Sequence, residues 1–127
     1  MTDLSALRYT SEHEWVLIDG DIATVGITDH AVEQLGDIVY VDMPADDATL
    51  AAGHVMGEVE STKSVSELYA PVDGQVIELN GAVDADPSLV NRDPFGDGWL
   101  IRVRLSGQPL TGLMDRDAYL ELTGGGA

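Results

Sequence analysis

The stretch that decides the fold spans residues 54–70 and reads HVMGEVESTKSVSELYA. Its first half alternates in a period of two, which predicts a β-strand over residues 54–61. A second strand is predicted over residues 64–70 and is ended by Pro71. The short gap between the two strands contains Lys63, so the pattern places this lysine near the tip of a β-hairpin.

Short strands rich in β-branched and aromatic residues are predicted on both sides of this hairpin. They lie at residues 7–9, 14–18, 22–27, 37–43, 75–79 and 99–105. Their regular spacing, interrupted by turn residues, is typical of a barrel or sandwich. The sequence therefore predicts a mainly β fold.

Two short peripheral helices are expected near residues 28–35 and 114–122. The first would begin at Thr28, a good N-cap residue, and end at Gly36. Residues 46–52 and 80–98 are expected to be irregular connections. The length of 127 residues fits one domain over residues 1–127, with a flexible glycine-rich tail at about 123–127.

The composition excludes several classes of protein. At 44% apolar residues the chain can bury a core, but it has no apolar run of about 18 residues that would span a membrane. The N-terminus lacks the basic and apolar regions of a signal peptide, so we expect a cytoplasmic protein. The chain has no cysteine, so any redox-active sulfur would have to come from a cofactor.

The charge is strongly acidic. There are 23 acidic and 6 basic residues, and the formal net charge is -17. This charge repels phosphate backbones and anionic lipid surfaces, so we expect binding neither to nucleic acid nor to membranes. It fits equally well a surface that aids solubility and a surface that steers the chain toward basic faces of partner proteins.

Lys63 is the only lysine in the chain, and the other five basic residues are arginines. An amine can be acylated, whereas a guanidinium stays protonated and is a poor nucleophile. A hairpin tip exposes such an amine to a modifying enzyme, and the flanking strands hold the turn in a fixed geometry. A chain attached there would reach on the order of 10 Å beyond the turn. From this pattern alone, an ordinary turn lysine remains an alternative.

The residues around Lys63 resemble the lipoyl-attachment segment of the glycine cleavage H proteins. The similar residues are ESTKS at 60–64, followed by Ser66 and Pro71. Three further segments resemble the family in the same order: YTSEHEW at 9–15, residues 25–41 and residues 87–99. Thr62 stands where valine is more usual and Phe95 where tyrosine is common, and neither change alters the expected role of the segment.

This resemblance implies a hybrid barrel-sandwich of the lipoyl/biotinyl-carrier type, with lipoate joined to Lys63 through an amide. A lipoate ligase or a lipoyl/octanoyl transferase would attach it. The glycine decarboxylase (P protein) would load an aminomethyl group onto the lipoyl sulfur, and the aminomethyltransferase (T protein) would remove it. Dihydrolipoyl dehydrogenase (L protein) would reoxidise the dithiol. The chain would thus be a carrier in glycine catabolism and one-carbon metabolism, and not an enzyme.

The resemblance also implies a surface cleft into which the loaded arm folds, here called the arm cleft. By position, Glu14 and Glu67 would line it and hold the aminomethyl amine, with Glu12 and Gln34 as weaker candidates. A charged amine buried beside a carboxylate is physically sound, because pairing offsets the loss of hydration. For each of these side chains, an ordinary solvated surface position remains the alternative.

Several other classes stay open. A biotin carrier would use the same hairpin, although methionines usually flank its lysine. A lipoyl domain of a 2-oxoacid dehydrogenase is a second possibility, and an interaction module with unmodified Lys63 is a third. Nothing indicates an enzyme or a metal site: His13-Glu14 is not followed by the second histidine of a zinc-protease motif, and the three histidines lack metal-ligand spacing.

Overall fold

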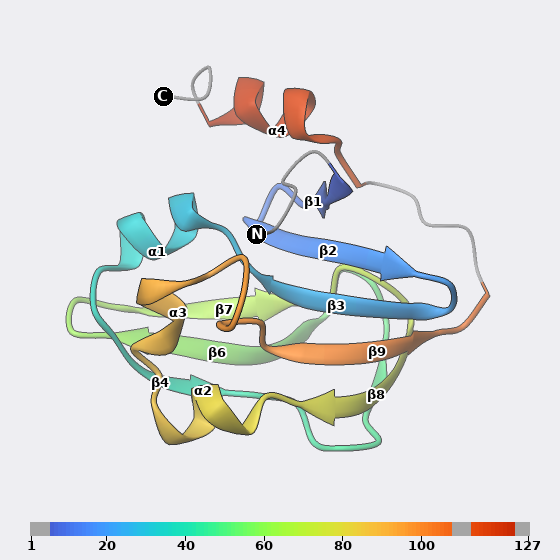
Figure 1. Cartoon of the computed structure of the whole chain (residues 1–127), viewed down its shortest axis with the longest axis horizontal. Helices are drawn as coiled ribbons and strands as arrows, with labels where there is room; N and C mark the ends of the chain where they lie inside the picture. Colours follow the sequence, from blue (N-terminus) through green and yellow to red (C-terminus); the bar gives the residue numbers. More distant parts are fainter. Residues whose placement is uncertain (1–5, 108–112, 124–127) are drawn as a thin grey trace.

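The computed structural model describes residues 6–107 and 113–123, which form nine strands and four short helices (Figure 1). The strands are β1 Arg8–Tyr9, β2 Glu14–Asp19, β3 Ile22–Ile27, β4 Ile38–Asp42, β5 Thr49–Leu50, β6 Val55–Ser61, β7 Val65–Tyr69, β8 Gly74–Leu79 and β9 Ile101–Leu105. The helices are α1 Asp29–Leu35, α2 Gly81–Ala85, α3 Leu89–Arg92 and α4 Arg116–Leu122. None of the helices in these ranges is long and apolar enough to cross a membrane.

The strands form two antiparallel sheets. The larger sheet has six strands in the order β1-β2-β3-β9-β8-β5, and the smaller has three in the order β4-β6-β7. Figure 1 shows the helices at the periphery of these strands, with α4 beside β1 at one end. The predicted mainly β fold with short peripheral helices is therefore confirmed, and its β-structure is divided between two sheets in the described chain.

The main core is built from alternating strand residues of both sheets. Val25, Val76 and Val103 are fully buried on the larger sheet, and Val59 and Leu68 face them from the smaller one. Each buried side chain of this kind contributes roughly 1.5–3 kcal/mol through burial of apolar surface. This core fixes the two strands that carry the lysine turn.

A second apolar cluster joins α4 to the beginning of the chain. Leu7, Tyr9, Trp15 and Tyr119 are all buried there. The rings of Tyr9 and Tyr119 stack with their centroids 4.6 Å apart, and the hydroxyl oxygen of Tyr119 lies 2.7 Å from Oγ1 of Thr28. The cluster holds α4 near the start of α1.

Helix α1 begins and ends as predicted. Oγ1 of Thr28 accepts a hydrogen bond from the backbone N–H of Ala31, and Gly36 ends the helix with φ of 84°. Helix α4 begins at Arg116, slightly later than the expected 114, because Asp115 is its N-cap and accepts from Ala118 N–H. Of the expected flexible tail at 123–127, only Thr123 lies within the described residues.

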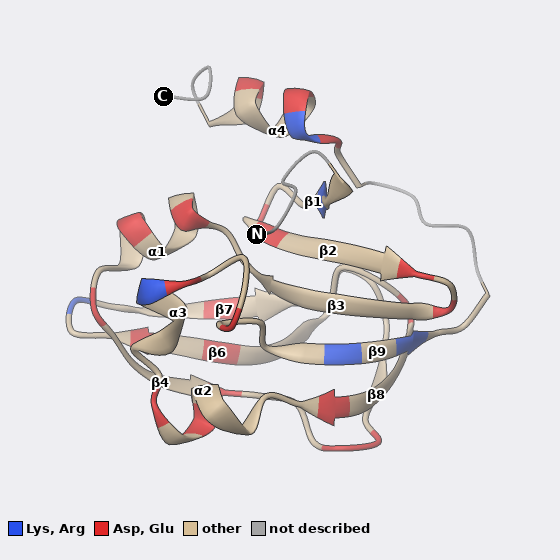
Figure 2. Cartoon of the chain, viewed as in Figure 1, with Lys and Arg blue, Asp and Glu red and all other residues tan. Residues whose placement is uncertain are grey.

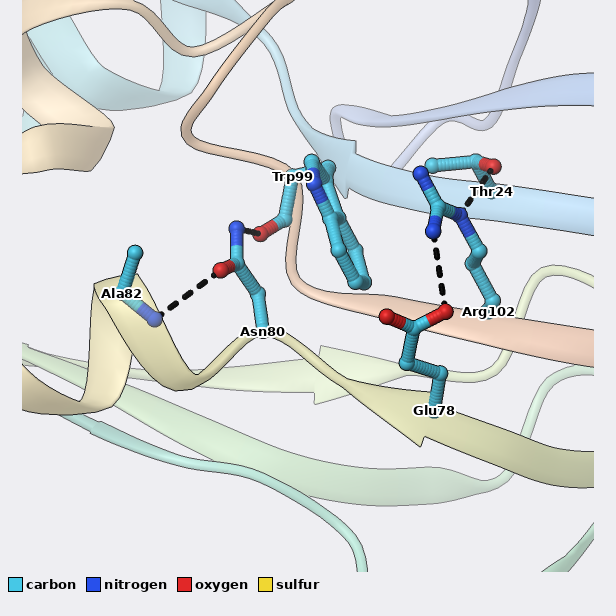
Figure 3. Close-up of polar contacts among 6 residues, drawn as sticks. All are labelled: Thr24, Glu78, Asn80, Ala82, Trp99 and Arg102. Atoms are coloured by element: carbon cyan, nitrogen blue, oxygen red, sulfur yellow. Dashed lines mark hydrogen bonds and ion pairs between the residues drawn. The ribbon is translucent and has the colours of Figure 1, made fainter.

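The expected irregular connections were wrong in two places. Residues 46–52 contain the short strand β5, and residues 80–98 contain α2 and α3. Asn80 organises the second region: its Oδ1 accepts from Ala82 N–H as the cap of α2, and its Nδ2 donates to the carbonyl of Trp99 (Figure 3). The same Nδ2 also donates to the carbonyl of Asp97. One buried amide thus ties both ends of this region together.

Arg102 of β9 contacts residues at both ends of this region. Its guanidinium lies over the Trp99 ring at 4.2 Å from the centroid, and Nη1 forms an ion pair with Glu78 at 2.9 Å (Figure 3). Because these groups are partly exposed, the ion pair contributes little beyond positioning. The arginine is occupied by its neighbours on the sheet.

Candidate cofactor-attachment site

Lys63 lies in the turn between β6 and β7, and its side chain is exposed. Ser61 stabilises the turn through both its backbone and its side chain. Its backbone N–H donates to the carbonyl of Ser64 at 2.8 Å, and its Oγ accepts from the backbone N–H groups of Lys63 and Ser64, each at 3.1 Å. The sequence-based position of Lys63 at a hairpin tip is therefore confirmed, and the turn is held by its own hydrogen bonds.

The turn is also fastened to the segment between α1 and β4. The N–H of Thr62 donates to the carbonyl of Asp37 at 3.0 Å, and Ser61 pairs with Ile38 in the sheet. The lysine stem lies against Gly36: a Cβ atom added to that glycine would be 3.0 Å from Cε of Lys63. The lysine therefore sits on neighbouring backbone before its amine reaches solvent.

The hairpin beneath the lysine is acidic, as the red segments of β6 and β7 in Figure 2 show. Asp42, Glu58 and Glu67 are paired in register across β4, β6 and β7, and all three are exposed. Like charges directly opposite one another destabilise a sheet, so this row of three carboxylates lowers the stability of the sheet slightly. Glu67 belongs to this row on the outer face of the smaller sheet.

Glu14 occupies a very different environment, because its side chain is only 1% exposed. Oε1 accepts from Thr10 Oγ1 at 2.7 Å and Oε2 accepts from the backbone N–H of Tyr69 at 3.1 Å. Burial raises the pKa of Glu14 from its ordinary value of 4.5 to about 7, against the lowering effect of these two hydrogen bonds. The carboxyl can thus be neutral or ionised near neutral pH.

Two pockets contain most of the side chains predicted for the arm cleft. A pocket of about 350 Å³ is lined by Glu12 and Glu14, together with Thr10 and Tyr69. A second pocket, of about 530 Å³, is lined by Gln34 and Lys63, together with His30, Glu33 and Thr123. The structure therefore groups Glu12 with Glu14 and Gln34 with Lys63, while Glu67 lines neither pocket.

Two of the three histidines lie together near Tyr119 of α4. The rings of His13 and His30 are 4.6 Å apart between centroids, and Nδ1 of His13 lies 2.9 Å from the Tyr119 hydroxyl. Burial and the proximity of His30 lower the pKa of His13, and Glu12 acts in the opposite direction. Local pattern does not predict this pair, because His13 lies just before β2 and His30 lies in α1.

Several residues of the site were not predicted as site residues from the sequence. Thr10 and Tyr69 complete the environment of Glu14, and Gly36 and Asn91 complete that of the lysine turn. Gly36 was noticed as the expected end of a helix, and Thr10 and Asn91 lie in the family-like segments 9–15 and 87–99, which gave them no role. Asn91 lies 55 residues from its partner Gly36 along the chain, so local pattern does not reveal the contact.

The rigid β-hairpin and the exposed amine at its tip define a class of protein: a carrier domain that presents a lysine for a covalently attached cofactor. A family model described as "Glycine cleavage H-protein" matches residues 7–124. The chain belongs to this family, whose members carry lipoate in the glycine cleavage system and are not themselves catalysts.

Named relatives are similar in sequence to this chain over nearly its whole length. A glycine cleavage system H protein of Clavibacter sepedonicus is 58% identical over 124 residues, covering 98% of this chain and 99% of the relative. One of Thermobifida fusca is 54% identical and covers 94% of each. The crystal structure of a glycine cleavage system H protein from Mycobacterium marinum matches with a TM-score of 0.89 at 42% identity, covering 94% of this chain and 98% of that one.

Proposed function

We propose that Lys63 carries lipoate through an amide bond. The observation that carries this proposal is an exposed primary amine, the only lysine of the chain, on a turn held by Ser61 and Asp37. Its surroundings fit such a group, because the turn exposes the amine while the paired strands fix its place. When bound, lipoate supplies a dithiol/disulfide pair whose sulfur accepts an aminomethyl group and whose redox state can change.

The path along β7 leads from Lys63 toward the Glu14 pocket. Tyr69 lies six positions beyond Lys63 along the chain, about 20 Å at ~3.3 Å per residue, and Tyr69 N–H contacts the Glu14 carboxyl. The lysine stem and lipoyl chain extend together on the order of 10–15 Å. An arm lying along β7 would thus cover half or more of this path and point toward Glu14.

Glu14 would receive the amine end of the cargo. Burial raises the pKa of this carboxyl to about 7. An ammonium group entering the pocket favours the carboxylate, because the two opposite charges pair where water is excluded. Glu14 would therefore release its proton as the cation arrives, and the pair would shield the cargo from water.

The other predicted cleft residues take supporting roles in this proposal. Glu12 lines the Glu14 pocket and adds negative charge at its mouth. Gln34 lies beside Lys63 and would contact the near end of the arm. Glu67, exposed on β7 between the lysine and Tyr69, would lie along the path.

The partners are proposed from the family. The glycine cleavage system implies P, T and L proteins, and we propose that glycine decarboxylase, aminomethyltransferase and dihydrolipoyl dehydrogenase each dock this chain in turn. A lipoate ligase or lipoyl/octanoyl transferase would load it. The net charge of -17 and the acidic row Asp42, Glu58 and Glu67 favour basic docking faces on these partners. A cytoplasmic location stays a prediction.

The test is the intact mass of the protein after incubation with a lipoate ligase, ATP and lipoate. We expect one lipoyl increment on the wild type and none on Lys63→Arg, which keeps the charge but not the acylable amine. Incubation of both proteins with a biotin ligase and biotin is the parallel arm. A biotinyl increment in place of a lipoyl one, or no increment at all, would overturn the proposal.

A second arm of the test measures cargo transfer. Lipoylated wild type and lipoylated Glu14→Gln are compared in a reconstituted glycine cleavage assay, and the Lys63→Arg variant gives the baseline. We expect Lys63→Arg to be inactive and Glu14→Gln to lose its aminomethyl cargo to solvent faster than the wild type. Equal cargo lifetimes in the two lipoylated proteins would remove Glu14 from the proposal and leave Lys63 in place.

A further inference from the structure

We infer that Gly36 and Asn91 are positioning residues for the acylation of Lys63, forming a seat for the lysine under the turn. The inference rests on the proposed modification of Lys63. Neither residue would touch the incoming acyl group. They would act by fixing where the lysine and its turn stand when a modifying enzyme docks.

Gly36 provides the floor of this seat. Its backbone lies so close to the lysine stem that an added Cβ would be 3.0 Å from Cε and 3.6 Å from Nζ of Lys63. A contact of 3.0 Å forces one of the two groups to move, and the lysine is the more mobile. Only a residue without a side chain leaves the stem in its observed place.

Asn91 fixes the backbone around Gly36 through two hydrogen bonds. Its Oδ1 accepts from the backbone N–H of Ile38 at 2.9 Å, and its Nδ2 donates to the carbonyl of Gly36 at 2.8 Å. The amide therefore bridges both ends of the segment Gly36 to Ile38. Between them, the carbonyl of Asp37 accepts from Thr62 N–H in the lysine turn. Asn91 is thus connected to the turn through a single backbone segment.

This geometry has a kinetic consequence. A lysine side chain has several freely rotating bonds, and an enzyme that acylates it must find the amine in one orientation. A seat that limits the stem and fixes the turn raises the fraction of encounters in which the amine is correctly placed. Loss of the seat should lower the enzymatic rate on the order of tenfold, whereas a small reagent needs no such orientation.

The chain offers a matched control for each variant. Gly20 also has positive φ, +64° against +84° at Gly36, but nothing lies within 4 Å of a Cβ added there. It sits in the β2–β3 turn, at the opposite end of the molecule from the lysine turn (Figure 1). Asn80 is the control for Asn91, because both side-chain amides bond backbone groups: three for Asn80 and two for Asn91. The partners of Asn80 all lie within residues 82–99.

The experiment compares Gly36→Ala with Gly20→Ala, and Asn91→Ala with Asn80→Ala. For each full-length variant we measure kcat and KM of acylation by a lipoate ligase, the rate of acylation of Lys63 by an N-hydroxysuccinimide ester, and the thermal midpoint. We expect kcat of Gly36→Ala and Asn91→Ala to fall about tenfold with KM within about twofold. The ester rate should stay at the wild-type value in all four variants.

Two outcomes would overturn the inference. One is that Gly36→Ala and Asn91→Ala are acylated by the ligase as fast as their controls. The other is that the controls lose as much kcat at equal thermal midpoints, which would indicate a general effect of destabilisation. Failure of the proposed function looks different, because wild-type protein would then accept no lipoyl group at all.

Discussion

Replacing Glu14 with glutamine removes a carboxyl group that folding buries to 1% exposure. Its pKa is about 7 in the folded protein against an ordinary value of 4.5. Below pH 4.5 the group is protonated in both states and burial has no electrostatic cost. Between pH 4.5 and about 7 the unfolded chain ionises while the folded chain keeps its proton, so wild-type stability falls as pH rises. Above that window the loss is constant.

The size of this loss follows from the two pKa values. At 1.36 kcal/mol for each pKa unit, the difference corresponds to about 3 kcal/mol of folding free energy. Glutamine cannot ionise, so Glu14→Gln does not undergo this loss of stability as the pH rises. We expect its free energy of unfolding, relative to wild type, to rise by about 3 kcal/mol between pH 4.5 and pH 8.

Urea denaturation of both proteins at intervals from pH 4.5 to pH 8 measures this difference directly. Subtracting the two curves cancels the other acidic residues, which the proteins share. A less favourable hydrogen bond between the new amide and Thr10 would shift the whole difference curve without changing its slope. Glu121→Gln removes the same charge from an exposed position on α4 and should run parallel to wild type. A flat difference curve for Glu14→Gln would refute the reasoning.

Two further substitutions test the packing around the site. Gly26→Ala would place a Cβ 2.6 Å from the Trp15 ring. We expect this overlap to lower the free energy of unfolding, measured by urea denaturation, by about 1–3 kcal/mol or more. An unchanged denaturation midpoint would contradict the contact. Tyr119→Phe removes a hydroxyl that bonds Thr28 and His13 and should cost about 1–3 kcal/mol by the same measurement, with no loss of ellipticity. Wild-type stability in Tyr119→Phe would contradict the contribution assigned to the hydroxyl.

Local patterns in the sequence predicted the elements whose signals are local. The period-two alternation of residues 54–61 and the turn around Lys63 were enough to place the hairpin that carries Lys63. Thr28 and Gly36 marked both ends of α1. The strand β5 was missed because two residues carry no periodicity, and α2 was missed because its cap, Asn80, sits in a region rich in turn-forming residues.

The chemistry of the site was harder to predict because it depends on distant contacts. Family resemblance singled out Glu14, but its pKa is raised by burial in the folded chain, against the lowering effect of hydrogen bonds from Thr10 and Tyr69, and Tyr69 lies 55 residues away. The bridge from Asn91 to Gly36 spans the same separation along the chain. Such pairs depend on how the two sheets and the helices pack, which no window of neighbouring residues contains.

The single exposed lysine at a hairpin tip also makes this molecule convenient to label. An amine-reactive fluorophore can meet one side-chain target, so dye or spin-probe attachment at the tip needs no engineered cysteine. A lysine-specific protease likewise has one site, which acylation would block. Resistance to that protease would therefore report how much of a preparation is loaded, by gel electrophoresis alone.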